Sequence, residues 1–235
     1  MNLSQQQLTL KVKGKIISYI MKQYKAVIFD FDGTLANTYE GIFNSYSYAA
    51  EQMGLQKPTR KMVDGAIGAA PPDVFQEKFM LTKEDADKAT VIYRSRYAKY
   101  GIYEVQLYDG MQQLLEYLKN KKIKIGIATL KLEKFAKSIC EYLNINELFD
   151  DISGVDNKDK LTKSQIILKS LSNMGVSPED AVLIGDSKYD AVGAKEAGVD
   201  FLAVTYGFGF KQNEDIKDYD TVGIVDSTYS LNKLL

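Results

Sequence analysis

The stretch Ala26-Val27-Ile28-Phe29-Asp30-Phe31-Asp32-Gly33-Thr34 decides the fold class of this 235-residue chain. Its first four residues form an apolar run, which is typical of a strand buried on both faces of a parallel sheet. Asp30 and Asp32 follow that run directly. Because open α/β sheets bind ligands at the carboxyl ends of their strands, the stretch predicts both a fold and the place of a site.

Three later apolar runs repeat this pattern. Residues 123–128 precede Thr129, residues 181–184 precede Gly185-Asp186, and residues 201–204 precede Thr205. Apolar residues at helical spacing lie between the runs: Met111, Leu114, Leu115 and Leu118; Phe135, Ile139 and Leu143; Ile166, Ile167, Leu171 and Met174. Strands that alternate with helices predict right-handed βαβ units and therefore an α/β fold with a doubly wound parallel sheet.

Residues 37–105 interrupt this alternation. Their apolar residues have helical spacings without a convincing buried strand, and a structureless loop of that length is implausible. We therefore predict an inserted α-helical cap at 37–105, with the catalytic core formed by 21–36 plus 106–235. Residues 1–20 are interpreted as an N-terminal extension, either a short amphipathic helix or a translation-start artefact, since Met21 could itself begin the chain.

The composition excludes several classes of enzyme. The chain has no histidine, which removes Ser-His-Asp machinery and every His-ligated metal site, and its single cysteine excludes an internal disulfide framework. A net charge of −1 gives no reason to expect nucleic acid or an anionic membrane as a partner, and no apolar stretch approaches the length of a membrane span. With no recognisable targeting segment, a cytoplasmic location is expected. Catalysis must rely on carboxylates, hydroxyls, lysines and a hard metal ion.

The ends of the predicted strands supply those groups. A parallel sheet would bring together carboxylates, one hydroxyl and one lysine: Asp30, Asp32, Asp186, Asp190, Thr129 and Lys163. Clustered carboxylates repel one another unless a cation neutralises them, and an oxygen-only ligand set favours Mg²⁺. A lysine and a hydroxyl beside that ion suit a phosphate group, so the set indicates phosphoryl transfer.

With these motifs the chain resembles phosphatases of the haloacid dehalogenase (HAD) superfamily, which it matches over about residues 24–207. Within the superfamily it is most similar to the phosphoglycolate phosphatase and bacterial 5′-nucleotidase-like branch, on Ile67-Gly68 followed by Pro71-Pro72, on Tyr108-Asp109-Gly110 and on 185–198. The resemblance implies a HAD Rossmann-like core with an inserted cap. It also implies Mg²⁺-dependent hydrolysis of a small phosphorylated metabolite, such as phosphoglycolate, a nucleoside monophosphate or a sugar phosphate.

The resemblance also implies a role for each residue that matches a motif. Asp30 would be the nucleophile that forms an aspartyl-phosphate, and Asp32 would protonate the leaving group and then activate water. The groups implied to bind the phosphate are Gly33, Thr129, Leu130 and Lys163. The groups implied to hold Mg²⁺ are Asp30, the Asp32 carbonyl, Asp186 and, directly or through water, Asp190. Leu130 stands where many relatives carry Ser or Asn, so only its backbone N–H can serve.

Three alternatives remain open from the sequence. A hydrolytic 2-haloacid dehalogenase shares the fold, but needs neither a metal nor a proton donor at the position of Asp32. A non-enzymatic signalling module phosphorylated on Asp uses a similar set of residues, but is roughly 120 residues long and has no inserted cap. A mutase would need a bisphosphate cycle that nothing in the sequence identifies. The oligomeric state is not readable.

Overall fold

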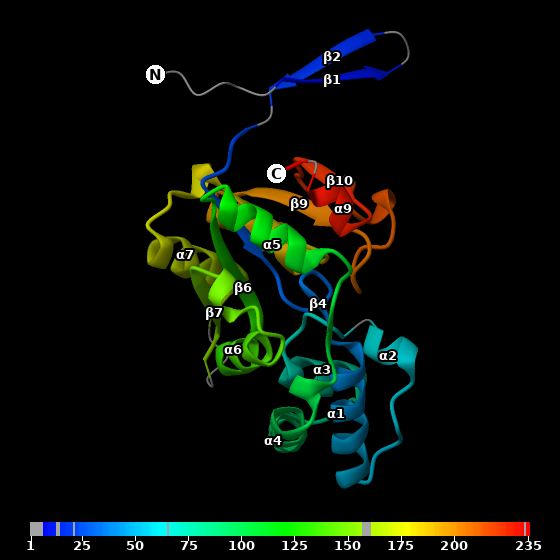
Figure 1. The fold of residues 1–235 in the computed structure, drawn as a ribbon. Coiled ribbons are helices and arrows are strands. Elements are labelled where there is room, and N and C mark those ends of the chain that lie inside the picture. The colour runs from blue at the N-terminus through cyan, green and yellow to red at the C-terminus, as the bar shows by residue number, and fades with distance from the viewer. Residues whose placement is uncertain (1–6, 13–14, 21, 65, 157–160, 233) are drawn as a thin grey trace.

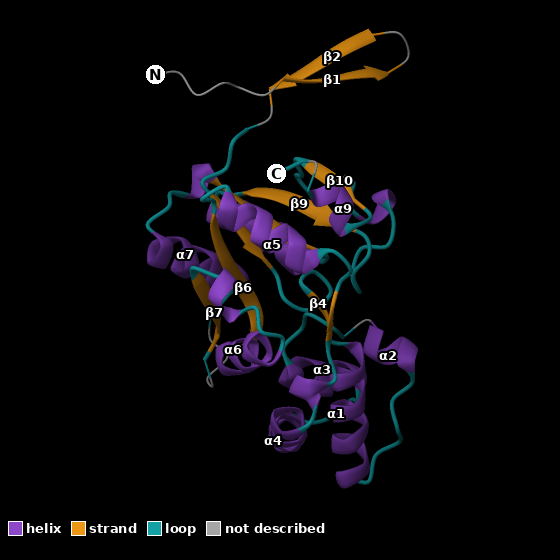
Figure 2. Cartoon of the chain, in the orientation of Figure 1, coloured by secondary structure: helices purple, strands orange, loops and turns teal. Residues whose placement is uncertain are grey.

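The structure is a computed structural model that describes all residues except 1–6, 13–14, 21, 65, 157–160 and 233. A six-stranded parallel sheet forms its centre, with the strand order β10-β9-β8-β3-β6-β7 (Figures 1 and 2). Its strands are β3 (Ala26–Phe29), β6 (Lys124–Leu132), β7 (Asp151–Val155), β8 (Ala181–Gly185), β9 (Asp200–Val204) and β10 (Gly223–Val225). The predicted α/β fold with a parallel sheet is confirmed.

Helices cover this sheet, and all but the last of them lie between its strands in the chain. They are α5 (Met111–Asn120), α6 (Glu133–Tyr142), α7 (Lys163–Met174), α8 (Lys188–Ala197) and α9 (Thr228–Leu231). α5 packs with α9 and crosses the front of the sheet in Figure 1, whereas α7 packs with α8. All four residues of β3 are fully buried, as expected of a central strand covered on both faces. None of the described helices is both long and apolar enough to cross a membrane.

The inserted segment is helical, as predicted. It contains α1 (Tyr39–Gln52), α2 (Arg60–Asp64), α3 (Pro71–Lys78) and α4 (Lys83–Lys99), which lie together below the sheet in Figure 1. A buried aromatic cluster of Tyr46, Phe75 and Tyr93 joins α1, α3 and α4, with ring centroids 4.5–6.4 Å apart. The short strands β4 (Ala36–Asn37) and β5 (Gln106–Leu107) pair antiparallel where the chain leaves and re-enters the core. The division into a core and a cap at 37–105 stays a prediction.

The structure differs from the sequence-based expectations in three places. β7 and β10 were not predicted, because their short sequences mix polar or glycine residues with apolar ones at the two edges of the sheet. β6 continues to Leu132 rather than ending before Thr129. The alternative of a helix within 1–20 is wrong for the described residues there, since β1 (Gln7–Val12) and β2 (Lys15–Ile20) form an antiparallel hairpin.

Candidate active site

The ends of three neighbouring strands bring the predicted residues together. β3 lies between β6 and β8, with Phe29 in register with Ile127 and Ile184. Asp30 and Asp186 therefore emerge side by side from β3 and β8, and Thr129 lies on the other side in β6. All three are buried. The side-by-side strand ends expected from the sequence are present in the structure.

Three carboxylates form one buried cluster around a lysine. Asp30, Asp186 and Asp190 each offer an oxygen, and these oxygens lie within 4.8 Å of one another. Nζ of Lys163 lies 2.5 Å from Oδ1 of Asp30 and 2.6 Å from Oδ1 of Asp190. Lys163 is the first residue of α7, where a capping box between Thr162 and Gln165 fixes the start of the helix.

The electrostatics of the cluster follow from its burial. Burial raises the pKa of Asp30 well above its usual range; Lys163 opposes this rise, whereas the charges of Asp190 and Asp186 add to it. Burial and the charge of Asp190 raise the pKa of Asp186 to about 7. Burial alone would lower the pKa of Lys163, but Asp190 and Asp30 outweigh it and raise that pKa. The lysine is therefore charged, while Asp30 and Asp186 bind protons more tightly than exposed carboxylates do.

Glycines let the chain approach Asp186 closely. Its Oδ2 accepts hydrogen bonds from the backbone N–H groups of Phe208 at 2.5 Å and Gly209 at 3.0 Å. Gly33 has a φ of +85°, and a Cβ at either Gly33 or Gly207 would collide with Oδ2. The N–H of Gly33 donates to the carbonyl of Ala36 at 3.0 Å. The absence of a side chain at Gly33 and Gly207 thus leaves space for this oxygen of Asp186, which the N–H groups of Phe208 and Gly209 hold in place.

Asp190 is held by the start of α8. Its Oδ2 accepts hydrogen bonds from the backbone N–H and the hydroxyl of Ser187, at 3.0 and 2.6 Å, in a capping box. Its Oδ1 faces Lys163. Asp190 thus faces the ammonium with one oxygen and fixes the helix with the other.

Asp32 has a separate environment. Its Oδ1 accepts a hydrogen bond from the hydroxyl of Thr38 at 2.6 Å and lies 3.0 Å from Nζ of Lys131. Lys131 also donates to the hydroxyl of Tyr97 at 2.8 Å. Burial disfavours the ammonium form, but Asp32 and Tyr97 outweigh this effect and raise the pKa of Lys131. The sequence analysis missed Lys131, although it lies only two residues after Thr129 and lines the same cavity.

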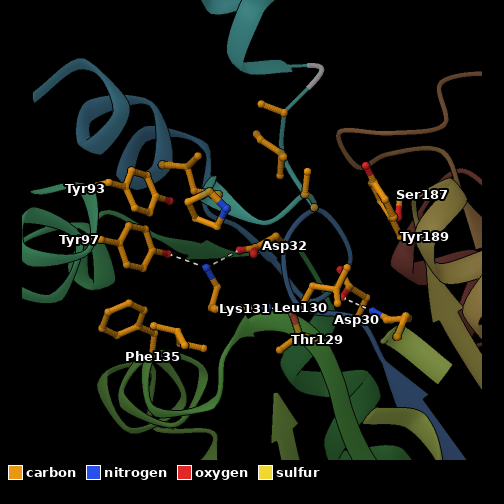
Figure 3. A pocket seen from close by; sticks show the side chains of 18 of the residues that line it. Asp30, Asp32, Tyr93, Tyr97, Thr129, Leu130, Lys131, Phe135, Ser187 and Tyr189 are labelled. Carbon is orange, nitrogen blue, oxygen red and sulfur yellow. Dashed lines mark hydrogen bonds and ion pairs between the residues drawn. The ribbon is translucent and has the colours of Figure 1, made fainter. Parts of the chain in front are cut away.

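A cavity of about 60 Å³ connects Asp30, Lys163 and Asp190 with Asp32 and Lys131. The core contributes Asp30, Asp32, Thr129, Leu130 and Lys163 to its walls. The helical insertion closes it with largely apolar and aromatic side chains: Ile42, Tyr46, Ala66, Ile67, Pro71, Tyr93 and Tyr97, together with Arg94. Figure 3 shows Asp32 and Lys131 beside Tyr93 and Tyr97, with Thr129 of β6 and Asp30, which follows β3, in the same view. The cavity thus joins the charged groups of the core to side chains of the helical insertion.

Comparisons with known proteins agree with this geometry. The family model of haloacid dehalogenase-like hydrolases matches residues 27–204. A 5′-nucleotidase of Pseudomonas aeruginosa is 31% identical over 80% of this chain and 85% of its own, and the tyrosine-protein kinase PtkA of Mycobacterium tuberculosis is 29% identical over 88% and 70%. The crystal structure of a predicted phosphatase from Clostridium acetobutylicum superposes with a TM-score of 0.84 at 32% identity, covering 90% of this chain and 97% of that one. Phosphoglycolate phosphatases are also among the relatives.

The chain therefore belongs to the haloacid dehalogenase-like hydrolases. The resemblance identified from the motifs is confirmed, and so is the expectation of an enzyme of the phosphatase class. The signalling-module alternative does not agree with this assignment to a family of hydrolases.

Proposed function

We propose that this hydrolase is a Mg²⁺-dependent phosphatase that cleaves a small phosphate monoester through an aspartyl-phosphate on Asp30. The position of Asp30 is the observation that carries this proposal. Its buried carboxylate lies at the cavity, 2.5 Å from the ammonium of Lys163 and within the three-carboxylate cluster. A carboxylate approaches a phosphate dianion only where cations lie between them. The ammonium of Lys163 is one such cation, and the three carboxylates could bind Mg²⁺ as a second.

The charges of the cluster fit a divalent cation. When Asp30, Asp186 and Asp190 are all ionised, these three carboxylates beside the ammonium of Lys163 leave two negative charges among these described groups, which a divalent cation would balance. Buried oxygen ligands of this kind suit Mg²⁺. We propose that the three carboxylates and the Asp32 carbonyl hold it. When bound, the ion would neutralise charge on the phosphate and on Asp30.

The residues of the chain then divide the reaction between them. A carboxylate oxygen of Asp30 attacks phosphorus, the bond from phosphorus to the ester oxygen breaks, and Asp32 gives its proton to the departing oxygen. Asp32 next takes a proton from a water molecule, whose oxygen attacks phosphorus. The bond from Asp30 to phosphorus breaks and orthophosphate leaves. The hydroxyl of Thr129, the backbone at Leu130 and Gly33, and Lys163 would hold the phosphoryl oxygens.

The substrate would be a small phosphorylated metabolite. The small cavity and its closure by side chains of the insertion support this, with residues 37–105 acting as a cap over the leaving group. A proton donor in the position of Asp32 favours phosphatase over dehalogenase chemistry, because a halide departs without needing a proton.

Trapping the intermediate tests the mechanism. The protein with Mg²⁺ and a ³²P-labelled phosphomonoester, chosen from a panel by turnover, is quenched in acid within milliseconds, and the labelled peptide is mapped. We expect hydroxylamine-sensitive label on Asp30, and turnover and label both lost in Asp30→Asn. Asp87→Asn, at an exposed acid in α4, should behave as wild type. Label at another residue, or full turnover by Asp30→Asn, would overturn the mechanism.

A further inference from the structure

Lys131 links Asp32 to helix α4. Its side chain is only 6% exposed, and its Nζ lies 3.0 Å from Oδ1 of Asp32 and 2.8 Å from the hydroxyl of Tyr97. Figure 3 shows the ammonium between these two groups. Lys131 belongs to β6 and Tyr97 to α4, so this series of contacts joins the central sheet to the helical insertion.

The neighbours of Lys131 are themselves fixed. Tyr97 is buried, and its ring packs against Phe135 of α6 and Tyr93 of α4, with centroids 5.3 and 5.8 Å away. Nζ of Lys131 also lies 4.6 Å from the centroid of the Tyr97 ring. The lysine therefore occupies a site built by both parts of the chain.

Two donors converge on one oxygen of Asp32. Thr38, which precedes α1, donates to Oδ1 at 2.6 Å, and the ammonium of Lys131 approaches the same atom. Two contacts at one carboxylate oxygen restrict the rotation of the group. Proton transfer requires such placement, because a donor must lie within hydrogen-bond reach of the atom it protonates.

We propose that Lys131 is a positioning residue for Asp32, and that Tyr97 makes this positioning depend on contact between α4 and the sheet. The inference rests on the proposed function, in which Asp32 gives a proton to the leaving oxygen and later takes one from water. With Oδ1 held by Lys131 and Thr38, Oδ2 is the oxygen that exchanges the proton. If α4 moved away from the sheet, the Tyr97 hydroxyl would leave Lys131, so proton transfer would depend on the contact that the structure shows.

Leaving groups of different basicity test this role. 4-Nitrophenolate departs without a proton, whereas an aliphatic alkoxide needs one. For Lys131→Met we expect kcat/KM to fall by about 10²-fold with an aliphatic phosphomonoester, but by less than about 3-fold with 4-nitrophenyl phosphate. kcat should fall for both substrates where hydrolysis of the intermediate limits turnover. Tyr97→Phe, which keeps the ring, should have a weaker effect with the same dependence on the leaving group. We expect kcat/KM to fall by about 3- to 10-fold with the aliphatic ester.

Other variants separate this inference from the proposed function. Asp32→Asn should show the same dependence on the leaving group, but more strongly, and Lys134→Met, at an exposed neighbour, should show none. If Asp32→Asn lacks the dependence, the proposed role of Asp32 is wrong. The inference fails if Asp32→Asn shows the dependence on the leaving group while Lys131→Met and Tyr97→Phe lower kcat/KM equally for both esters or change only KM. Lys131 would then contact the substrate or merely support the fold.

Discussion

Lys163 and Asp30, which are 133 positions apart in the chain, meet with Nζ 2.5 Å from Oδ1 in the buried centre of the site. The same ammonium lies 2.6 Å from Asp190, so one cation serves two carboxylates. An ion pair of this kind is costly to break, because the partner that remains is a buried charge. The arrangement therefore couples the stability of the fold to the groups assigned to chemistry.

Replacing Lys163 with methionine should lower both the activity and the stability of the protein. We expect Lys163→Met to lower kcat/KM by roughly 10²- to 10³-fold, because the proposed function assigns this charge to the phosphate. It should also lower the free energy of unfolding by about 3–5 kcal/mol in urea titrations, because two carboxylates lose their partner. Lys169→Met is the matched control in the same helix, since Lys169 pairs with Glu133 at a partly exposed position, and it should cost at most about 1 kcal/mol. Equal losses in the two variants would contradict this prediction.

The raised pKa values predict how stability depends on pH when the metal is absent. The pKa of Asp186 is about 7 in the folded protein against an ordinary value of 3.8, so the folded chain binds more protons than the unfolded chain between these values. Stability must therefore fall as pH rises through that window, by up to about 4 kcal/mol from this group. The pKa of Glu133 is lowered to about 2, so its ionised form contributes to folding stability at every pH above about 4.5. This contribution is lost only at lower pH and is therefore constant from pH 5 to 8.

Urea unfolding with EDTA at pH 5, 6, 7 and 8 measures this dependence. Asp186→Asn should flatten the profile, which isolates the group from the rest of the chain. If Mg²⁺ binds to Asp186 as proposed, it must displace the retained proton. Calorimetry in buffers of different ionisation enthalpy should then detect proton release on binding, with apparent affinity rising from pH 6 to 8. If the stability of the wild type instead rose with pH relative to that of Asp186→Asn, the predicted direction of the pH dependence would be wrong.

The sequence predicted the strand-end geometry because parallel strands with short connections leave few alternatives. Asp30, Thr129 and Asp186 each follow or end a recognisable apolar run, and β3 places them together. Lys131 was missed because the apolar run stops at Ala128, whereas β6 continues to Leu132. The strands β7 and β10 are short and lie at the edges of the sheet, where pairing rather than hydrophobic pattern defines them.

The partners of Asp32 could not be predicted for a different reason. Tyr97 belongs to a helix whose spacing shows that it buries aromatic residues, but not which of them faces the core. That choice depends on how α4 packs against α6, through the contact of Tyr97 with Phe135. Local patterns identify the groups that carry chemistry, whereas the tertiary packing decides which neighbours orient them.

Gly33 should be sensitive to the smallest possible side chain. With φ at +85° and Oδ2 of Asp186 in the space of a Cβ, Gly33→Ala strains the turn and displaces that carboxylate. We expect Mg²⁺ affinity and kcat/KM to fall at least about 10-fold, as for the loss of a group that orients a ligand. Gly54→Ala shares the positive φ of +67° but meets no atom within 4 Å, so it should cost only about 1 kcal/mol and leave activity intact. Similar Mg²⁺ titrations for both variants would show that crowding at Asp186 is unimportant.

The aromatic cluster of the insertion allows a test of the proposed division into core and cap. Phe75 is fully buried, with Tyr46 and Phe79 at centroid distances of 5.2 and 5.0 Å, so Phe75→Ala should lower stability by about 3–5 kcal/mol. If residues 37–105 fold as a unit, hydrogen exchange should accelerate first in α1, α3 and α4 and leave β3 and β8 protected. Leu183→Ala, at a fully buried position in β8, is the matched variant. In this variant hydrogen exchange should accelerate first in the sheet and leave α1, α3 and α4 protected. Uniform acceleration across sheet and insertion in both variants would mean that the chain unfolds as one cooperative unit, without a separable cap.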